Sequence, residues 1–294
     1  MIITVGGSEG IDIALRAMLD RDDEVLIPQP SYVSYEPCTI LAGGKPVIIE
    51  LKAEDGFKLK ASQILEKVTD KTKILILPFP NNPTGSILNM DELREIAKVC
   101  IEKDLYVISD EIYCELTYEG EHASIVQIEG MKERTVLING FSKSYAMTGW
   151  RLGYATGPKE IISQMTKIHQ YAIMCAPTTS QYAAVEALAH GDADVARMRE
   201  SYNQRRRYLL HRFEELGMTC FEPQGAFYVF PSIKRFGMSS EEFATRLLEE
   251  QKIAIVPGTA FGECGEGYVR VSYAYSMERL KEALSRIEKF VRSL

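Results

Sequence analysis

The sequence predicts an α/β fold: a doubly wound domain with a largely parallel sheet between helices, followed by a smaller α+β domain. Short runs rich in Val and Ile alternate with helical patterns over the first two-thirds of the chain. Such runs, without strict apolar–polar alternation, are typical of strands buried on both faces of a parallel sheet. After Pro158 the strand signals stop and helical patterns follow. The length of 294 residues agrees with about two domains.

The first part of the chain contains seven predicted strands separated by helices. The strands are Ile2–Val5, Glu24–Ile27, Pro46–Leu51, Ile74–Leu77, Leu105–Ser109, Thr135–Ile138 and Gly153–Thr156. An amphipathic pattern predicts a helix over Ser8–Asp20. The segment Asn89–Glu92 resembles a capping box and predicts a helix that runs to about Asp104. The alternation of strands and helices indicates a doubly wound sheet.

The second part is predicted to be mostly helical, with a few short strands. Helices are expected at Lys159–Cys175, Pro177–His190, Ala193–Leu216, after Ser239, and from about Ser276 to Val291. Strands are expected at Gly225–Phe230, Ile253–Val256 and Tyr268–Tyr273. We therefore divide the chain into a large α/β domain, residues 1–196, and a small α+β domain, residues 197–294, joined through the long helix near Arg197–Leu216.

The composition disfavours several classes of partner. Asp and Glu total 41 against 34 Lys and Arg, so the net charge is −7 and general binding to nucleic acid is not expected. Apolar residues make up 46%, which excludes a disordered chain. Apolar runs such as Ile74–Leu77 are too short to cross a bilayer, so no membrane contact is expected. The segment Met1–Asp12 has no basic residue before its apolar stretch, unlike a secretory signal.

The cysteines and histidines show no metal or disulfide pattern. The six cysteines are scattered without a C-x-x-C pair. In a chain of this length they indicate buried thiols in a reducing cytoplasm. The four histidines share no metal-ligand spacing, so no metal is expected.

Polar residues gather where the predicted strands end. In open α/β sheets, ligands bind just beyond the carboxyl ends of the strands. The segments at those ends are Gly6–Glu9, Pro78–Gly85, Asp110–Tyr113 and Asn139–Arg151. Together they would bring an amide, a carboxylate, a phenol, a lysine and an arginine to one edge of the sheet. A glycine-rich helix start there would offer backbone N–H groups to an anion.

In their order along the chain, these motifs resemble those of the class I and II aminotransferases, pyridoxal 5'-phosphate (PLP) enzymes of fold type I. The resemblance spans nearly the whole chain, and Ser-Lys followed eight residues later by Arg is its most specific part. The matching stretches are Gly6–Glu9, Pro30–Tyr32, Asn81–Gly85, Ser109–Tyr113, Ser142–Lys143, Gly149–Gly153 and Arg270–Ser272. One departure is Gly140, where several relatives carry a serine; this bears on the subgroup, not on activity.

The resemblance implies a role for each residue around the ring of the cofactor. Lys143 would be the catalytic residue, forming the Schiff base with the PLP aldehyde and carrying the proton to and from the substrate α-carbon. Asp110 would face the pyridine nitrogen and keep it protonated. Tyr113 and Asn82 would hydrogen-bond the phenolic oxygen of the ring, and Tyr32 would stack on its face.

The resemblance also implies two anion sites. The cofactor phosphate would be bound by Ser142, Arg151 and the backbone amides of Gly7, Ser8 and Glu9. The substrate α-carboxylate would be held by Arg270, with Asn82 beside it, because a planar guanidinium matches a carboxylate at two points.

The implied function is transfer of an amino group between an L-amino acid and a 2-oxo acid, in a homodimer. Two alternatives stay open: a PLP-dependent C–S β-lyase, which shares removal of the α-proton, and a non-catalytic aminotransferase-like sensor domain. The sequence does not single out the amino acid. Because Met1 lies five residues before Gly6, we also expect an N-terminally short chain that lacks part of the family's small domain.

Overall fold

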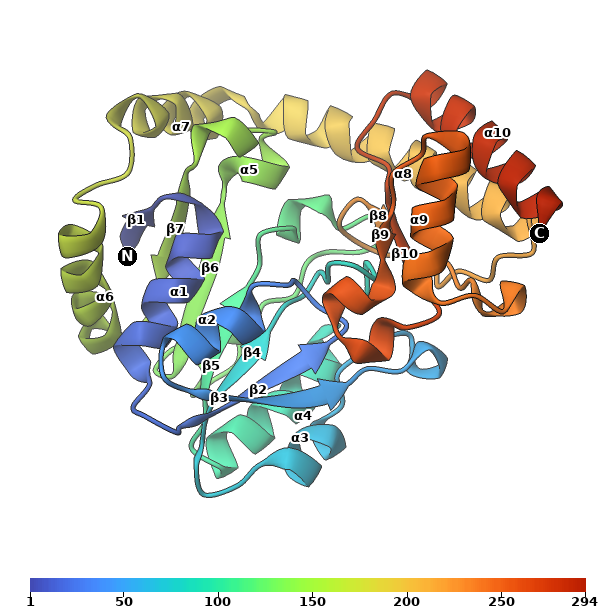
Figure 1. Ribbon diagram of the computed structural model, residues 1–294. Coiled ribbons are helices and arrows are strands. Elements are labelled where there is room, and N and C mark those ends of the chain that lie inside the picture. The colour runs from blue at the N-terminus through green and yellow to red at the C-terminus, as the bar shows by residue number, and fades with distance from the viewer.

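The computed structural model describes residues 1–294 and contains a seven-stranded mixed sheet (Figure 1). The strand order is β1-β7-β6-β5-β4-β2-β3. Strands β2 to β6 run parallel to one another, whereas β7 is antiparallel to both β6 and β1. The strands are β1 (Ile2–Thr4), β2 (Glu24–Gln29), β3 (Lys45–Glu50), β4 (Thr72–Leu77), β5 (Tyr106–Asp110), β6 (Thr135–Gly140) and β7 (Gly153–Thr156).

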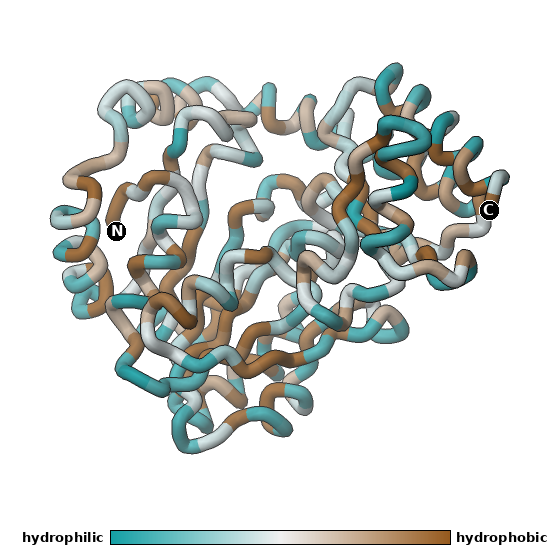
Figure 2. The backbone as a smooth tube through the Cα atoms, in the orientation of Figure 1, coloured by the Kyte–Doolittle hydropathy of each residue, from teal (hydrophilic) through white to brown (hydrophobic).

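Helices cover both faces of this sheet, which confirms the predicted α/β sandwich. The helices of this part are α1 (Gly6–Met18), α2 (Tyr35–Leu41), α3 (Ala61–Lys67), α4 (Met90–Glu102), α5 (Phe141–Ser144) and α6 (Lys159–Ala172). One apolar core joins the sheet to α3 and α4, and a second joins it to α1 and α6. Figure 2 shows the hydrophobic strands in the interior, with hydrophilic stretches on the outer helices.

Two helix starts show how local sequence sets the elements. Helix α1 begins at Gly6, two residues before the predicted start, and Gly6 adopts a φ of +78° that favours glycine. The capping box before α4 is confirmed: Oδ1 of Asn89 accepts from the Glu92 N–H at 2.9 Å, and Oε2 of Glu92 accepts from the Asn89 N–H at 2.8 Å. This helix ends at Glu102, slightly earlier than predicted.

The C-terminal part has its own core around a three-stranded antiparallel sheet of order β8-β10-β9. Its elements, with the two helices that lead to it, are α7 (Thr178–His190), α8 (Asp192–Glu215), β8 (Tyr228–Val229), α9 (Ser240–Gln251), β9 (Val256–Pro257), β10 (Val269–Ser272) and α10 (Met277–Ser293). The predicted strand Ile253–Val256 is wrong for most of its length, because pairing with β10 involves only Val256 and Pro257. Helix α8 is continuous across residue 196, so our division at 196/197 remains a proposal.

The cysteines differ in part from the prediction. All six are free, but only Cys100 is fully buried and Cys175 is exposed, so the expectation of buried thiols is wrong for Cys175. The reason is its place in the connection between α6 and α7, outside both cores. None of the helices combines the length and the apolar character needed to span a bilayer.

Candidate active site

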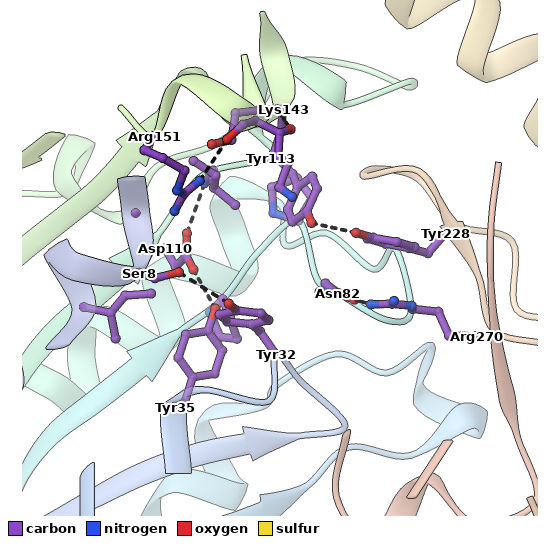
Figure 3. Close-up of a pocket in the computed structure, with 17 residues that line it drawn as sticks. Ser8, Tyr32, Tyr35, Asn82, Asp110, Tyr113, Lys143, Arg151, Tyr228 and Arg270 are labelled. Atoms are coloured by element: carbon purple, nitrogen blue, oxygen red, sulfur yellow. Dashed lines mark hydrogen bonds between the residues drawn. The ribbon is translucent and has the colours of Figure 1, made fainter. Parts of the chain in front are cut away.

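The carboxyl ends of the parallel strands and the edge of the C-terminal sheet enclose a cavity of about 390 Å³. Except for Glu9, every residue predicted for the site lines this cavity. Figure 3 shows these side chains converging from both parts of the chain. The predicted residues that line it are Gly7, Ser8, Tyr32, Asn82, Asp110, Tyr113, Ser142, Lys143, Arg151 and Arg270.

Asp110 is the last residue of β5 and is buried at the floor of the cavity. Its Oδ2 accepts a 2.7 Å hydrogen bond from the Tyr35 hydroxyl, and its Oδ1 accepts one of 3.2 Å from the Ile112 N–H. Burial raises the pKa of Asp110, while the hydrogen bond from Tyr35 and the positive charge of Lys143 act in the opposite direction. The carboxylate is therefore held in one orientation by its neighbours.

Tyr35 was missed by the sequence reasoning. It is the first residue of α2 and is almost fully buried, with its ring packed edge-on against Tyr32 at a centroid distance of 5.6 Å. The sequence carried no helical signal for it, because Tyr32 precedes α2 and the spacing Tyr32-x-x-Tyr35 does not by itself predict that the two phenols meet. Burial and the adjacent Asp110 raise the pKa of Tyr35 well above its usual value, so its hydroxyl keeps the proton that it donates.

Lys143 lies in the short helix α5, directly after β6. Its Nζ lies 5.6 Å from the ring centroid of Tyr113 and 5.7 Å from that of Phe227. Burial lowers the pKa of Lys143; Asp110 opposes this effect, while Arg270 adds to it. A lysine with a lowered pKa has a larger fraction of free amine at neutral pH, which makes it a better nucleophile.

A candidate anion site lies at the N-terminus of α1. Gly7 and Ser8, in the first turn of α1, line the cavity together with Ser142 and Arg151. The guanidinium of Arg151 packs directly on Gly6, where an added Cβ would meet Nη2 at 2.6 Å. The first N–H groups of a helix have no partner within it, and the helix dipole favours negative charge there. An arginine above such a turn completes a site for a phosphate.

Glu9 follows this turn but does not line the cavity. Its carboxylate points back into the protein, where one oxygen accepts from the Val5 N–H and the other from Nδ1 of His169 at 2.7 Å. Only the backbone amide of Glu9 was predicted to take part in the site.

The opposite end of the cavity is formed by Arg270 of β10. Its Nη1 donates to Oδ1 of Asn82 at 2.9 Å, and its guanidinium carbon lies 4.3 Å from the ring centroid of Tyr228 and 4.8 Å from that of Phe261. Nε of Arg270 is buried without a hydrogen-bond partner. A buried donor without a partner is costly, and a carboxylate bound in this cavity would satisfy it.

Two tyrosines connect the parts of the chain across the cavity. The hydroxyls of Tyr113 and Tyr228 lie 3.1 Å apart, and burial raises the pKa of both groups. Tyr228 is the second residue that sequence reasoning missed, because nothing in the predicted strand Gly225–Phe230 says which side chain faces the cavity. Tyr32 lies across from them, with its hydroxyl 3.3 Å from the Ser8 hydroxyl.

Comparison with known proteins shows the family of the chain. The family model of aminotransferase class I and II matches residues 1–287. The putative aminotransferase YugH of Bacillus subtilis is 51% identical, over 99% of this chain and 75% of that protein. An aspartate aminotransferase of Pyrococcus abyssi is 47% identical, over 99% of this chain and 76% of that protein.

A solved structure shows the same fold. The aromatic aminotransferase from Pyrococcus horikoshii OT3 superimposes with a TM-score of 0.97 at 45% identity, covering 99% of this chain and 78% of that one. Its fold therefore agrees with the one expected from the sequence. The chain belongs to the class I and II aminotransferases and is an enzyme that transfers amino groups.

Proposed function

We propose that this enzyme uses PLP, bound through Lys143, to move an amino group between an L-amino acid and a 2-oxo acid. The observation that supports this most directly is the arrangement of four groups around one cavity. These are the amine of Lys143, the carboxylate of Asp110, the anion site at α1, and the guanidinium of Arg270. They correspond to the aldehyde, ring nitrogen and phosphate of PLP and to the carboxylate of an amino acid.

The residues present fit this cofactor. Gly6 has a φ of +78°, which favours glycine, so a phosphate at the first turn of α1 would contact backbone without a side chain at Gly6. Asp110 is buried and accepts hydrogen bonds only from Tyr35 and Ile112, so a carboxylate is available for a protonated ring nitrogen. When bound, PLP supplies an electron sink for the electrons released at the substrate α-carbon.

The residues of the chain would then have separate tasks. Lys143, with its lowered pKa, would attach to the cofactor and, once released by the substrate, hold and move the proton of the α-carbon at Nζ. Asp110, oriented by Tyr35, would keep the ring nitrogen charged. Tyr113 and Asn82 would donate to the ring oxygen, and Tyr32 would pack on the ring face.

Arg270 would orient the substrate. Its contact with Asn82 and its position against Tyr228 and Phe261 hold the guanidinium plane in one direction. A carboxylate bound at two points would align the α-carbon with the ring. The named relatives act on aspartate, aromatic amino acids or N-acetyl-LL-diaminopimelate, so the side-chain preference has to come from a substrate screen.

We also propose a homodimer, with a second copy covering the face around α7. Tyr182, Val185 and Leu188 of α7 are 75%, 66% and 59% exposed. Tyr171 and Met174, just before this helix, are 92% and 80% exposed. The face adjoins the cavity rim, because the Ser180 hydroxyl of α7 donates to the carbonyl of Trp150 at 2.7 Å. The free thiols agree with a reducing, cytoplasmic setting.

The function is tested by a half-reaction screen on the purified chain loaded with PLP. Each amino acid is added in turn, and conversion of the cofactor is recorded by absorbance. We expect each reactive amino acid to release one equivalent of its 2-oxo acid as the cofactor is converted, and further turnover only when a 2-oxo acid acceptor is added. Pyruvate and ammonia released without an acceptor would instead identify the C–S β-lyase, and specific DNA binding without turnover would identify a sensor.

The role of Lys143 is tested separately by Lys143→Ala. After borohydride reduction, the peptide containing Lys143 of the unaltered enzyme should carry the cofactor mass, and the variant should carry none and should not turn over. Cofactor mass on another lysine, or turnover by the variant, would contradict the assignment.

A further inference from the structure

A hydrogen-bonded pair, Glu9 and His169, lies directly behind the anion site at α1. Nδ1 of His169 donates to Oε1 of Glu9 over 2.7 Å, and the side chains are 7% and 14% exposed. His169 comes from the last turn of α6. Oε2 of Glu9 accepts from the N–H of Val5, the residue that precedes α1. The pair therefore joins the end of β1, the first turns of α1 and the end of α6.

This pair sets the geometry with which the chain enters α1. Val5 occupies the N-cap position, but it has no side chain that could cap the helix. Instead, the Glu9 carboxylate accepts a hydrogen bond from the Val5 N–H, and the Thr4 hydroxyl donates to the carbonyl of Gly6 at 2.9 Å. With both flanking groups satisfied, Gly6 stays at its φ of +78°. The N–H groups of the first turn remain available to a ligand.

The charge of Glu9 has to be directed away from this turn. A carboxylate that faced the N-terminus of α1 would occupy the positive end of the helix dipole and repel a phosphate. The hydrogen bond from His169 holds the carboxylate on the side of α1 away from the cavity, and Glu9 is absent from the cavity wall. Ile162 and Met165 of α6 pack into the same core as Ile11 of α1, so His169 is carried on a rigid support.

We propose that Glu9 and His169 form a positioning pair that keeps the first turn of α1 in the shape that binds the cofactor phosphate, an inference that rests on the proposed function. Neither side chain touches the cofactor. Their effect would reach it through the backbone of Gly6, Gly7 and Ser8 and through the placement of the Glu9 charge.

The experiment compares two ligands on the apo form of the full chain. PLP and pyridoxal share the ring and the aldehyde, but only PLP carries the phosphate. The ratio of the two Kd values, measured by fluorescence titration, therefore reports the anion site alone. We expect Glu9→Ala and His169→Phe each to weaken PLP binding roughly tenfold, as for loss of a hydrogen bond to a charged group, and to leave the Kd of pyridoxal unchanged.

The controls separate this role from general destabilisation. His211→Asn removes a histidine from an exposed pair with Glu215 on α8 and should leave both Kd values unchanged. Glu9→Gln keeps an oxygen for the Val5 N–H and should retain part of the PLP affinity. The double variant Glu9→Ala, His169→Phe should bind PLP no more weakly than Glu9→Ala alone, because Glu9→Ala already removes the acceptor for His169. If the melting curve shows that Glu9→Ala does not fold, the two Kd values are measured for His169→Gln in its place.

The positioning role is wrong if the single variants weaken the binding of PLP and of pyridoxal by the same factor, or if they leave the binding of PLP unchanged. Failure of the proposed function gives a different result: the unaltered chain would then bind PLP no more tightly than pyridoxal, or bind neither. A strong preference of the unaltered chain for PLP that survives in both single variants would overturn the positioning role alone.

Discussion

The hydroxyl of Tyr35 donates a 2.7 Å hydrogen bond to Oδ2 of Asp110, and both groups are buried. This contact joins the first residue of α2 to the last residue of β5, 75 positions apart in the sequence. It sets the orientation of the carboxylate that we assign to the ring nitrogen. The contact also lowers the pKa of Asp110 against the stronger, opposite effect of burial.

We expect Tyr35→Phe to destabilise the apo-protein at neutral pH by about 1.5–3 kcal/mol, because a buried carboxylate loses a charged hydrogen bond. The pKa of Asp110, already raised by burial, should rise further. A carboxyl whose pKa is raised in the folded state lowers the free energy of unfolding above that pKa. This cost shrinks as the pH falls below the folded-state pKa and is absent below the pKa of the unfolded state. Urea unfolding should therefore show a larger deficit at pH 7 than at acidic pH.

The matched control for this prediction is Tyr275→Phe, which removes the hydroxyl of an exposed tyrosine. It should leave stability unchanged at both pH values. A deficit in Tyr35→Phe that does not depend on pH would show that Tyr35 contributes packing and not a bond to the charged form of Asp110.

The pKa of Lys143 should respond in opposite directions to two substitutions. Asp110 raises this pKa, so Asp110→Asn should lower it further, while Arg270 lowers it, so Arg270→Met should raise it. Both pKa shifts are measured by the rate at which an amine reagent labels Lys143, which mass spectrometry follows across a range of pH. In the unaltered apo-protein the midpoint should lie below 10.5, the ordinary value for lysine. Shifts in the same direction for both variants would contradict this electrostatic account.

Gly153→Ala should damage the anion site through the backbone. A Cβ at this position would meet the carbonyl carbon of Gly6 at 2.6 Å, the nitrogen of Gly7 at 2.8 Å and the carbonyl oxygen of Asn139 at 3.0 Å. Because all three are backbone atoms, they cannot move aside as a side chain would. We expect a loss of about 1–3 kcal/mol in unfolding free energy and weaker binding of PLP.

Gly149→Ala is the control for Gly153→Ala, since a Cβ at Gly149 meets nothing within 4 Å. Its melting temperature and PLP affinity should match those of the unaltered chain. If the two variants behave alike, close packing of β7 on the first turn of α1 is not what shapes the anion site.

Arg270→Lys should weaken substrate binding while leaving the cofactor bound. Lysine keeps the charge, but it lacks the planar pair of donors and the stacking surface for Tyr228. We expect KM for the amino acid to rise roughly tenfold to a hundredfold, the range for loss of a charge-assisted hydrogen bond. Arg199→Lys, on an exposed part of α8, should leave KM unchanged. An unaltered KM in Arg270→Lys would remove Arg270 from carboxylate recognition.

The proposed homodimer predicts that a charged side chain introduced on α7 prevents dimerisation. Val185→Lys would bury a charge against the second copy, so the variant should be monomeric where the unaltered chain is dimeric. Analytical ultracentrifugation measures the mass. Leu248→Lys changes an exposed apolar residue on α9 and should leave the dimer intact. A monomeric unaltered chain, or a dimeric Val185→Lys, would contradict the proposed interface.

Most of the cavity wall was predictable because its residues lie in short segments directly after buried strands. Asp110 is the last residue of β5 and Lys143 lies shortly after β6, and the carboxyl ends of neighbouring parallel strands meet at one edge. Tyr35 and Tyr228 escaped prediction for a different reason. They come from a helix start and from a two-residue strand, and neither position carries a local signal for the direction of its side chain.

The sequence by itself determined the strand and helix pattern, the family, and the residue types that meet at the sheet edge, because these depend on local periodicity and on motifs. Only the tertiary structure decided which polar atoms pair. Asn82 was expected both at a ring oxygen and beside Arg270, and only the structure shows that its Oδ1 accepts from Arg270, 188 positions away. Glu9 was expected to contribute only its backbone amide, and its carboxylate is found on His169, 160 positions away. Such pairs form because buried polar groups must find partners, and the packing of distant elements decides which partner is within reach.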